Sequence, residues 1–274
     1  MDYYALFLDN PHPMSLLLLL LLAMMRFIPI VIIAPFFGAQ LIPGPVKVGL
    51  IFSLAVIFLP LLMKLSPAPI AFDTNYIGLV FKELVIGFIM GFLVAVPFWI
   101  ANTSGILIDN QRGSSSMMMQ DPTLRTQASP IGRLYNFVLI YMFLSMGGLF
   151  YFLDSVSLSF TMVPPTEYIN PAFFLDTNIP LNQKIIDAGN ITISIATQLA
   201  APALVAILMS DLFLGISNRM APQVPMAFLG WALKSLVGMA ALWLAWGFIL
   251  QQLGQQTITW LVDINENVAD FGVK

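Results

Sequence analysis

Groups that could act as nucleophiles, acids or bases are sparse in this chain. Ser114, Ser115 and Ser116 would need a neighbouring base, yet the single histidine, His12, lies between two prolines in the N-terminal tail. Asp109 and Asp121 lie twelve residues apart in irregular sequence, which gives no support for paired acid–base work. We therefore expect no catalytic residues and predict that the chain is not an enzyme.

The chain also has few residues that could bind a metal ion or a nucleic acid. The chain has no cysteine, which excludes thiolate metal sites, iron–sulfur clusters and disulfides. A lone histidine between prolines is more typical of a solvated loop than of a metal ligand. The eleven Lys and Arg are scattered singly in a chain of net charge -3, so no basic stripe could bind a nucleic-acid backbone. We predict no metal, no cofactor and no nucleic-acid partner.

One polar stretch, residues 108–122, interrupts an otherwise apolar sequence. Its first part supplies hydrogen-bond donors and acceptors, and it continues with a glycine, three serines and three methionines. Irregular polar backbone at membrane depth is tolerated only beside protein or water, and methionine is deformable enough to refill a gap. The stretch is thus either a soft seal lining a cavity or an ordinary surface loop. Its candidate residues are Asp109, Asn110, Gln111, Arg112, Gly113, Ser114, Ser115, Ser116, Met117, Met118, Met119, Asp121 and Pro122.

The elements around this stretch are predicted to be membrane helices. The chain has 274 residues, of which 59% are hydrophobic and 9% charged, and its mean hydropathy is +0.88. Apolar segments of about 17–25 residues suffice to cross the hydrocarbon layer as helices. The sequence therefore predicts an all-α polytopic membrane protein with about six such segments. They are Met14–Ala34, Val46–Lys64, Ile77–Ala101, Arg133–Leu153, Ile185–Leu214 and Val224–Leu250, with a long link from Asp154 to Asn182.

Several charged residues lie within or beside these segments and should face protein or water, because a charge at the centre of a bilayer costs about 2.5–3.5 kcal/mol. Lys82 and Glu83 are interpreted as an interfacial pair that caps the third segment, with gating or proton transfer as the alternative. Asp211, Asn218 and Arg219 could pair with one another across the turn that follows the fifth segment. The full set is Arg26, Lys82, Glu83, Asp211, Arg219 and Lys234.

Small residues and prolines in the same segments favour packing against other helices. Gly87 and Gly91 have the small-xxx-small spacing that lets a second helix approach closely. Pro97, like Pro29 and Pro202, interrupts a helical run. We interpret the chain as a subunit buried among other helices.

Taken in order, these stretches resemble one family, the SctT/FliR subunits of type III export gates. In the first half the resemblance rests on Lys82–Gly91, Pro97–Trp99, Ile108–Gly113, Asp121-Pro122 and Ser129-Pro130. In the second half it rests on Ser159-Phe160, Ala201-Pro202, Asp211, Ser217–Gln223 and Leu233–Ser235. Arg26 and the Pro43–Pro45 turn also fit the family's N-terminal pattern.

The resemblance implies a core subunit of a protein-export channel in the bacterial inner membrane, multi-pass and partly raised towards the periplasm. It implies a hetero-oligomer of one copy of this chain with SctR, SctS and SctU, which passes unfolded proteins. The chain then forms a single domain over 1–274, with 1–182 similar to SctR and 183–274 similar to the two-helix hairpin of SctS. Residues 109–122 correspond to the segment that plugs the closed pore. The virulence branch, the injectisome, is favoured over the flagellar branch.

Two other functions remain open on the residues alone. A secondary solute transporter also uses broken helices and intramembrane charges, although no convincing inverted repeat is present. An inert scaffold that nucleates the export gate without sealing it would share the same partners.

Overall fold

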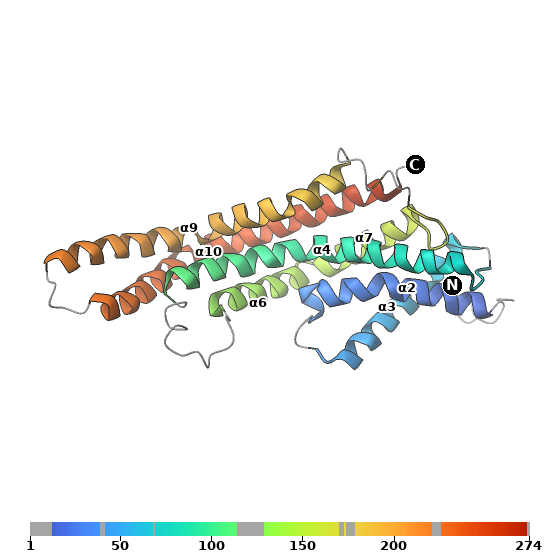
Figure 1. Ribbon diagram of the computed structural model, residues 1–274, viewed down its shortest axis with the longest axis horizontal. Coiled ribbons are helices and arrows are strands. Elements are labelled where there is room, and N and C mark those ends of the chain that lie inside the picture. Colours follow the sequence, from blue (N-terminus) through green and yellow to red (C-terminus); the bar gives the residue numbers. More distant parts are fainter. Residues whose placement is uncertain are drawn as a thin grey trace. The chain divides into compact units, whose positions relative to one another are not determined.

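The computed structural model describes residues 13–38, 42–67, 69–113, 129–169, 173, 179–220 and 226–272, and for 226–229 the backbone only. Within these ranges the chain is helical and contains no strand, which confirms the all-α class. The α-helices, labelled in Figure 1, are α2 (Pro13–Ile33), α3 (Gly44–Leu65), α4 (Thr74–Gln111), α6 (Pro130–Ser145), α7 (Gly148–Met162), α9 (Pro180–Met220) and α10 (Met226–Asn267). Two short 3-10 helices, η1 (Pro35–Phe37) and η2 (Val268–Gly272), follow α2 and α10.

Five helices are long and apolar enough to cross a membrane, namely α2, α3, α4, α9 and α10, and the broken pair α6–α7 makes a sixth if it is counted as one span. This agrees with the predicted number of segments. The expectation of one continuous segment over Arg133–Leu153 is wrong, because the helix breaks where Gly147 adopts a φ of 76°. The predicted link from Asp154 is also wrong, since α7 continues to Met162.

Three helices are much longer than their apolar segments. Helices α4, α9 and α10 contain 38, 41 and 42 residues, so each is about 57–63 Å long at 1.5 Å per residue, against about 30 Å of hydrocarbon. The third segment does not end at Ala101 as expected. The Ser104 hydroxyl donates to the Ala101 carbonyl at 2.8 Å, which satisfies this polar side chain inside the helix. Hydropathy detects the apolar part of such a helix and misses its polar continuation.

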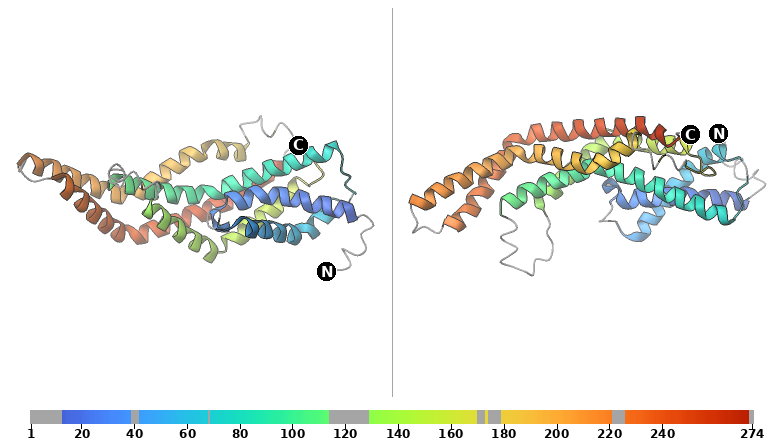
Figure 2. Two further views of the ribbon diagram at one scale, coloured as in Figure 1. Left: turned by 60° about the horizontal axis from the view of Figure 1, so that its bottom comes forward. Right: turned by 45° about the horizontal axis from the view of Figure 1, so that its top comes forward.

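The chain divides into two units, each with its own core. Unit 1 comprises Met1–Ala95, Gly147–Asp187 and Trp260–Lys274, and unit 2 comprises Val96–Met146 and Ala188–Thr259. Helices α4, α9 and α10 contribute to both units. Figures 1 and 2 show α9 and α10 side by side, and in unit 1 Lys184 Nζ of α9 lies 2.9 Å from Asp263 Oδ2 of α10.

Unit 1 is built on a close contact between α2 and α4. A Cβ atom at Gly87 would lie 2.1 Å from the Arg26 carbonyl oxygen, and one at Gly91 would lie 3.1 Å from the Ile30 Cα. The two glycines therefore let the backbones touch, as their spacing suggests. Beside this contact, the rings of Phe27, Phe58 and Phe160 join α2, α3 and α7, with centroids 5.2–6.1 Å apart.

Unit 2 has a comparable contact between α4 and α6. A Cβ atom at Gly105 would lie 2.2 Å from the Gly132 backbone nitrogen. Nearby, the rings of Phe98 and Phe143 pack edge to face with centroids 5.5 Å apart. Helices α9 and α10 are less buried than α4, since only 28% and 17% of their most apolar stretches are buried within the chain, against 72% for α4.

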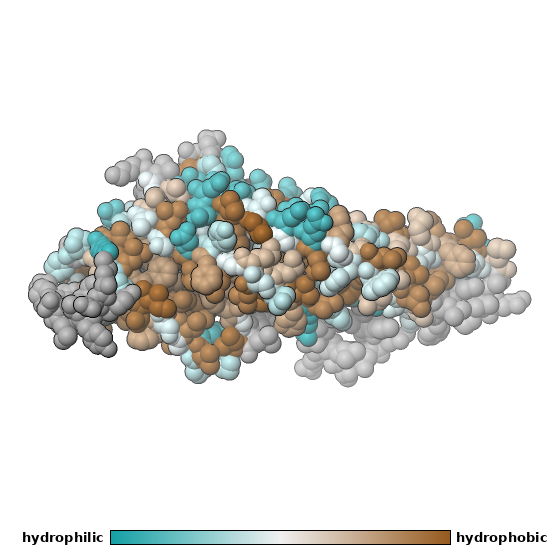
Figure 3. Space-filling view, turned by 180° about the vertical axis from the view of Figure 1, so that it is seen from behind, coloured by the Kyte–Doolittle hydropathy of each residue, from teal (hydrophilic) through white to brown (hydrophobic). Residues whose placement is uncertain are grey.

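The outer faces of α9 and α10 are strongly apolar. On the face in Figure 3, hydrophobic residues cover broad areas and hydrophilic ones gather in patches. Such faces suit lipid or neighbouring helices, as expected of a membrane protein. Their most exposed large side chains in unit 2 include Leu212, Phe213, Ile216, Met220, Leu236, Trp243 and Leu244.

The glycine contact in unit 1 yields the first prediction. Replacing Gly87 with Ala places a methyl group against the Arg26 backbone, so the free energy of unfolding should fall by about 1–3 kcal/mol. Gly49→Ala is the control, because a Cβ atom there meets nothing within 4 Å. Denaturant titration of the full chain in detergent micelles measures both variants. Equal stability of the two would show that close approach of α2 and α4 is not required.

Candidate functional site

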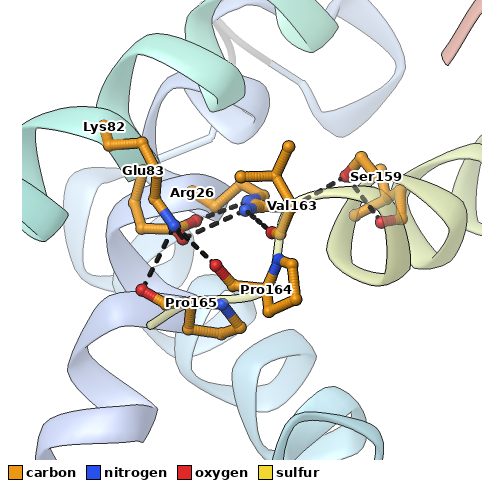
Figure 4. Close-up of polar contacts among 8 residues, drawn as sticks. Arg26, Lys82, Glu83, Ser159, Val163, Pro164 and Pro165 are labelled. Carbon is orange, nitrogen blue, oxygen red and sulfur yellow. Dashed lines mark hydrogen bonds and ion pairs between the residues drawn. The ribbon is translucent and has the colours of Figure 1, made fainter. Parts of the chain in front are cut away.

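Arg26 forms the centre of a buried charge cluster in unit 1 (Figure 4). Its Nε and Nη2 donate to the two carboxylate oxygens of Glu83 at 2.5 and 3.0 Å, which makes a bidentate pair between α2 and α4. Its Nη1 donates to Ser159 Oγ of α7 at 3.0 Å, and Nη2 also donates to the Val163 carbonyl at 3.1 Å. The guanidinium carbon lies 3.8 Å from the centroid of the Phe160 ring. One side chain thus connects three helices.

Lys82 adds a second cation to the cluster. Its Nζ lies 2.7 Å from Glu83 Oε1 and donates to the carbonyl oxygens of Pro164 and Pro165 at 2.9 and 3.1 Å. Figure 4 shows these carbonyls converging on the lysine. Two cations therefore share one carboxylate, and three backbone carbonyls and the Ser159 hydroxyl accept further hydrogen bonds from them. The arrangement satisfies charges that would be costly if left unpaired in an apolar interior.

The predicted interfacial role of Lys82 and Glu83 is wrong. Helix α4 begins at Thr74, so the pair does not cap it, and neither side chain snorkels, since Lys82 is 6% and Glu83 0% exposed. The polar residues Thr74 and Asn75 concealed the true start of the helix. Among the residues that the structure describes, no three His, Cys, Asp or Glu side chains gather in a group that could hold a metal ion.

In unit 2, Asp109 connects the two stems of the polar stretch, and we call this arrangement the loop base. Asp109 Oδ2 accepts hydrogen bonds from Ser129 Oγ at 2.6 Å and from the Ile131 backbone N–H at 3.0 Å. Ser129 Oγ in turn accepts from the Gly132 N–H at 2.9 Å. With Pro130 at the first helical position, the exposed donors of the α6 N-terminus are satisfied by Asp109 and Ser129. The end of α4 is thereby fixed to the start of α6.

Arg112 links the loop base to α10. Its Nη1 donates to Asp109 Oδ1 at 3.2 Å, and its Nη2 donates to Ser235 Oγ at 2.6 Å. After it, Gly113 turns the chain with a φ of 96°, a conformation that favours glycine. Three buried polar atoms of unit 2 have no hydrogen-bond partner among the described residues, namely Arg112 Nε, Tyr135 Oη and Asn136 Oδ1.

The remaining predicted residues fall in several places. Asp211 forms an ion pair with Lys234 of α10, so the predicted pairing of Asp211 with Arg219 is wrong. The reason is that α9 and α10 pack antiparallel as a hairpin and bring Lys234 opposite Asp211.

Pro97 lies buried inside α4 without ending it. Asn110 is exposed, and Gln111 ends α4. Ser114, Ser115, Ser116, Met117, Met118, Met119, Asp121 and Pro122 lie outside the described residues.

Three serines complete these clusters, although no role was predicted for them. Ser159 contacts Arg26, Ser129 contacts Asp109, and Ser235 contacts Arg112. For Ser129 a signal existed, because a serine directly before a proline is typical of a helix N-cap. For Ser159 and Ser235, single serines in apolar helices give no such signal.

Long apolar helices whose internal charges are paired within the chain define a multi-pass membrane protein that packs with other helices. Residues 17–259 match the family model of the bacterial export proteins, family 1. The chain belongs to this family, which is the SctT/FliR family of type III export proteins.

Named relatives come from both branches of the family. The chain is 28% identical over 212 residues to the surface presentation of antigens protein SpaR of Shigella flexneri, which covers 77% of this chain and 78% of that protein. It is 29% identical over 206 residues to the secretion system apparatus protein SsaT of Salmonella typhimurium, covering 74% and 76%. It is 29% identical over 218 residues to the flagellar biosynthetic protein FliR of Bacillus subtilis, covering 79% and 82%.

These comparisons identify a subunit of a protein-export apparatus with membrane-protein partners, in the bacterial inner membrane. Several relatives named for secretion favour the injectisome branch. Members of the family are components of the export apparatus and not enzymes, which confirms the prediction on catalysis.

The buried cluster yields a second prediction. Glu83→Gln removes the carboxylate that Arg26 and Lys82 share and leaves two cations facing an amide, so the free energy of unfolding should fall by about 3–5 kcal/mol. Glu266→Gln makes the same chemical change at an exposed position on α10 in unit 1, and should alter stability by less than about 0.5 kcal/mol. Denaturant titration in detergent micelles tests both. Similar losses for the two variants would mean that the buried pair has no special role.

Proposed function

We propose that this chain lines and seals the channel of a type III export gate, and that residues 109–122 form its plug. The channel admits unfolded substrate proteins, and the chain takes no part in catalysis. The observation that carries the proposal is the loop base. Asp109 bonds both to Arg112, just before the loop, and to Ser129, just after it, so the two stems are held together.

A plug must be held firmly enough to seal and weakly enough to yield. A shift from 1:99 to 99:1 between two states requires about 5.5 kcal/mol of differential binding. A few hydrogen bonds of about 0.5–3 kcal/mol each suit that range, whereas a large packed interface would exceed it. Polar groups at the stems would hold the loop in register. Met117, Met118 and Met119 would supply an apolar surface that deforms around a passing chain.

The organisation of the chain supports an assembly with SctR, SctS and SctU. Residues 1–182 would form the SctR-like portion with the plug, and 183–274 the SctS-like hairpin. Helices α9 and α10 support this division, because they pair along the hairpin through Lys184 with Asp263 and through Lys234 with Asp211. Three helices about twice as long as the hydrocarbon layer suit a subunit that is partly raised towards the periplasm.

A flagellar export gate is the second candidate function, and the match to FliR of Bacillus subtilis favours it. The sealing role would be the same in both branches, because it depends on the loop-base residues of this chain and not on which apparatus the chain joins. An inert scaffold differs in leakage, because changes in the loop would leave the gate tight. A solute transporter differs in its partners, because it would be recovered without the other subunits.

Leakage through the assembled gate tests the plug. Asp109→Asn weakens the bonds to Arg112 and Ser129, and a loss of about 1–2 kcal/mol of restraint would raise the open fraction roughly 5–30-fold. Entry of a small dye into cells that contain the complete apparatus should rise accordingly. Replacing Met117, Met118 and Met119 with glycine should also raise it.

Asp154→Asn is the matched control for this experiment, since Asp154 is exposed on α7. Co-purification of the other subunits must first show that each variant assembles. Assembled gates that stay tight with both the Asp109 and the methionine variants would refute the sealing role and leave the scaffold as the better explanation.

Partner identity is tested separately. Gentle detergent extraction of the tagged full chain should recover SctR-, SctS- and SctU-like proteins, identified by mass spectrometry. A solute transporter would instead be recovered without them, and the purified chain alone would catalyse solute uptake in vesicles.

A further inference from the structure

Helix α4 contains a proline that should leave one backbone carbonyl without a donor. Pro97 has no N–H, so the carbonyl of Leu93, four residues earlier, cannot receive its normal helical hydrogen bond. Water cannot easily replace that bond, because Leu93 is 0% exposed and its neighbours Val94 and Val96 are also buried. An unpaired carbonyl at such a position would be unfavourable.

A side chain from another helix supplies the missing donor. The indole Nε1–H of Trp260, on α10, donates to the Leu93 carbonyl at 2.8 Å. The indole is itself held in place, since Lys184 Nζ of α9 lies 5.8 Å from the centre of the Trp260 rings. Lys184 also pairs at 2.9 Å with Asp263, which follows Trp260 by three residues on the same face of α10. The donor and acceptor, Trp260 and Leu93, and the flanking pair of Lys184 and Asp263 all belong to unit 1.

We propose that Trp260 is a positioning residue, whose indole N–H replaces the backbone donor that Pro97 lacks and so keeps α4 intact through its proline. Beyond this point α4 continues to Asp109 at the loop base. This inference does not depend on whether the loop seals a channel.

The rival explanation is that Trp260 matters only as a bulky ring filling space against α4. The two explanations separate when the N–H is removed and the ring is kept. They also separate when the backbone donor is restored, because Pro97→Ala returns an N–H that can bond to the Leu93 carbonyl.

The test measures the midpoint of thermal unfolding of the full chain in detergent micelles by far-ultraviolet circular dichroism, in four proteins: the unaltered chain, Trp260→Phe, Pro97→Ala and the double variant. Trp260→Phe should lower the midpoint by roughly 2–4 °C in the unaltered chain, the shift expected on losing one hydrogen bond. In the Pro97→Ala background the same change should lower it by less than half as much. Equal shifts in both backgrounds would overturn the proposal.

Two further proteins make the result decisive. Replacing Trp260 with benzothienylalanine keeps a bicyclic ring of nearly the same shape and removes only the N–H, so the midpoint should fall even if Pro97→Ala does not fold. An unchanged midpoint in this variant would also overturn the proposal. Trp243→Phe serves as the control, because Trp243 is 78% exposed on the same helix and should show no shift.

Discussion

The structure of unit 1 depends on the bidentate pair between Arg26 and Glu83. The pair can form only because α2 and α4 approach to backbone contact, and the contact falls at Gly87, one turn after Glu83, against the carbonyl of Arg26 itself. Any side chain at position 87 would push the helices apart and lengthen the guanidinium–carboxylate distance. The glycine and the ion pair are thus two parts of one constraint. Since an unpaired buried charge is costly, the constraint also fixes how α7 must pack, through Ser159.

The same arrangement recurs at the other end of α4, in unit 2. There Gly105 provides the close backbone contact with Gly132, and Asp109, one turn later, binds the start of α6. In each unit, α4 therefore combines a glycine with an acid one turn away, and the acid accepts hydrogen bonds from the neighbouring helix. Both carboxylates of α4, Glu83 and Asp109, are therefore hydrogen-bonded although they are nearly inaccessible to solvent. Between these two points, Pro97 leaves the Leu93 carbonyl to be satisfied by Trp260.

Hydropathy predicted the helical class, the number of apolar segments and the polar character of the loop, because all three depend on composition over about twenty residues. It failed at Lys82 and Glu83, and at the ends of α4, where polar side chains are satisfied inside the helix and look like boundaries. The pairing of Arg26 with Glu83, 57 residues apart, and of Asp211 with Lys234 could not be predicted. Such pairings depend on which helices become neighbours, a property that a single sequence does not encode locally.

The loop base has a consequence for how the segment between α4 and α6 can evolve. Its two ends are held near each other by Asp109 and Ser129, whatever path the intervening residues follow. The entropy of closing a loop rises slowly with length, by about 0.6 kcal/mol for each doubling. Insertions, deletions and changes of composition there therefore add little strain to either helix. For the proposed plug, such freedom would let the segment suit cargo of different bulk while the loop base stays the same.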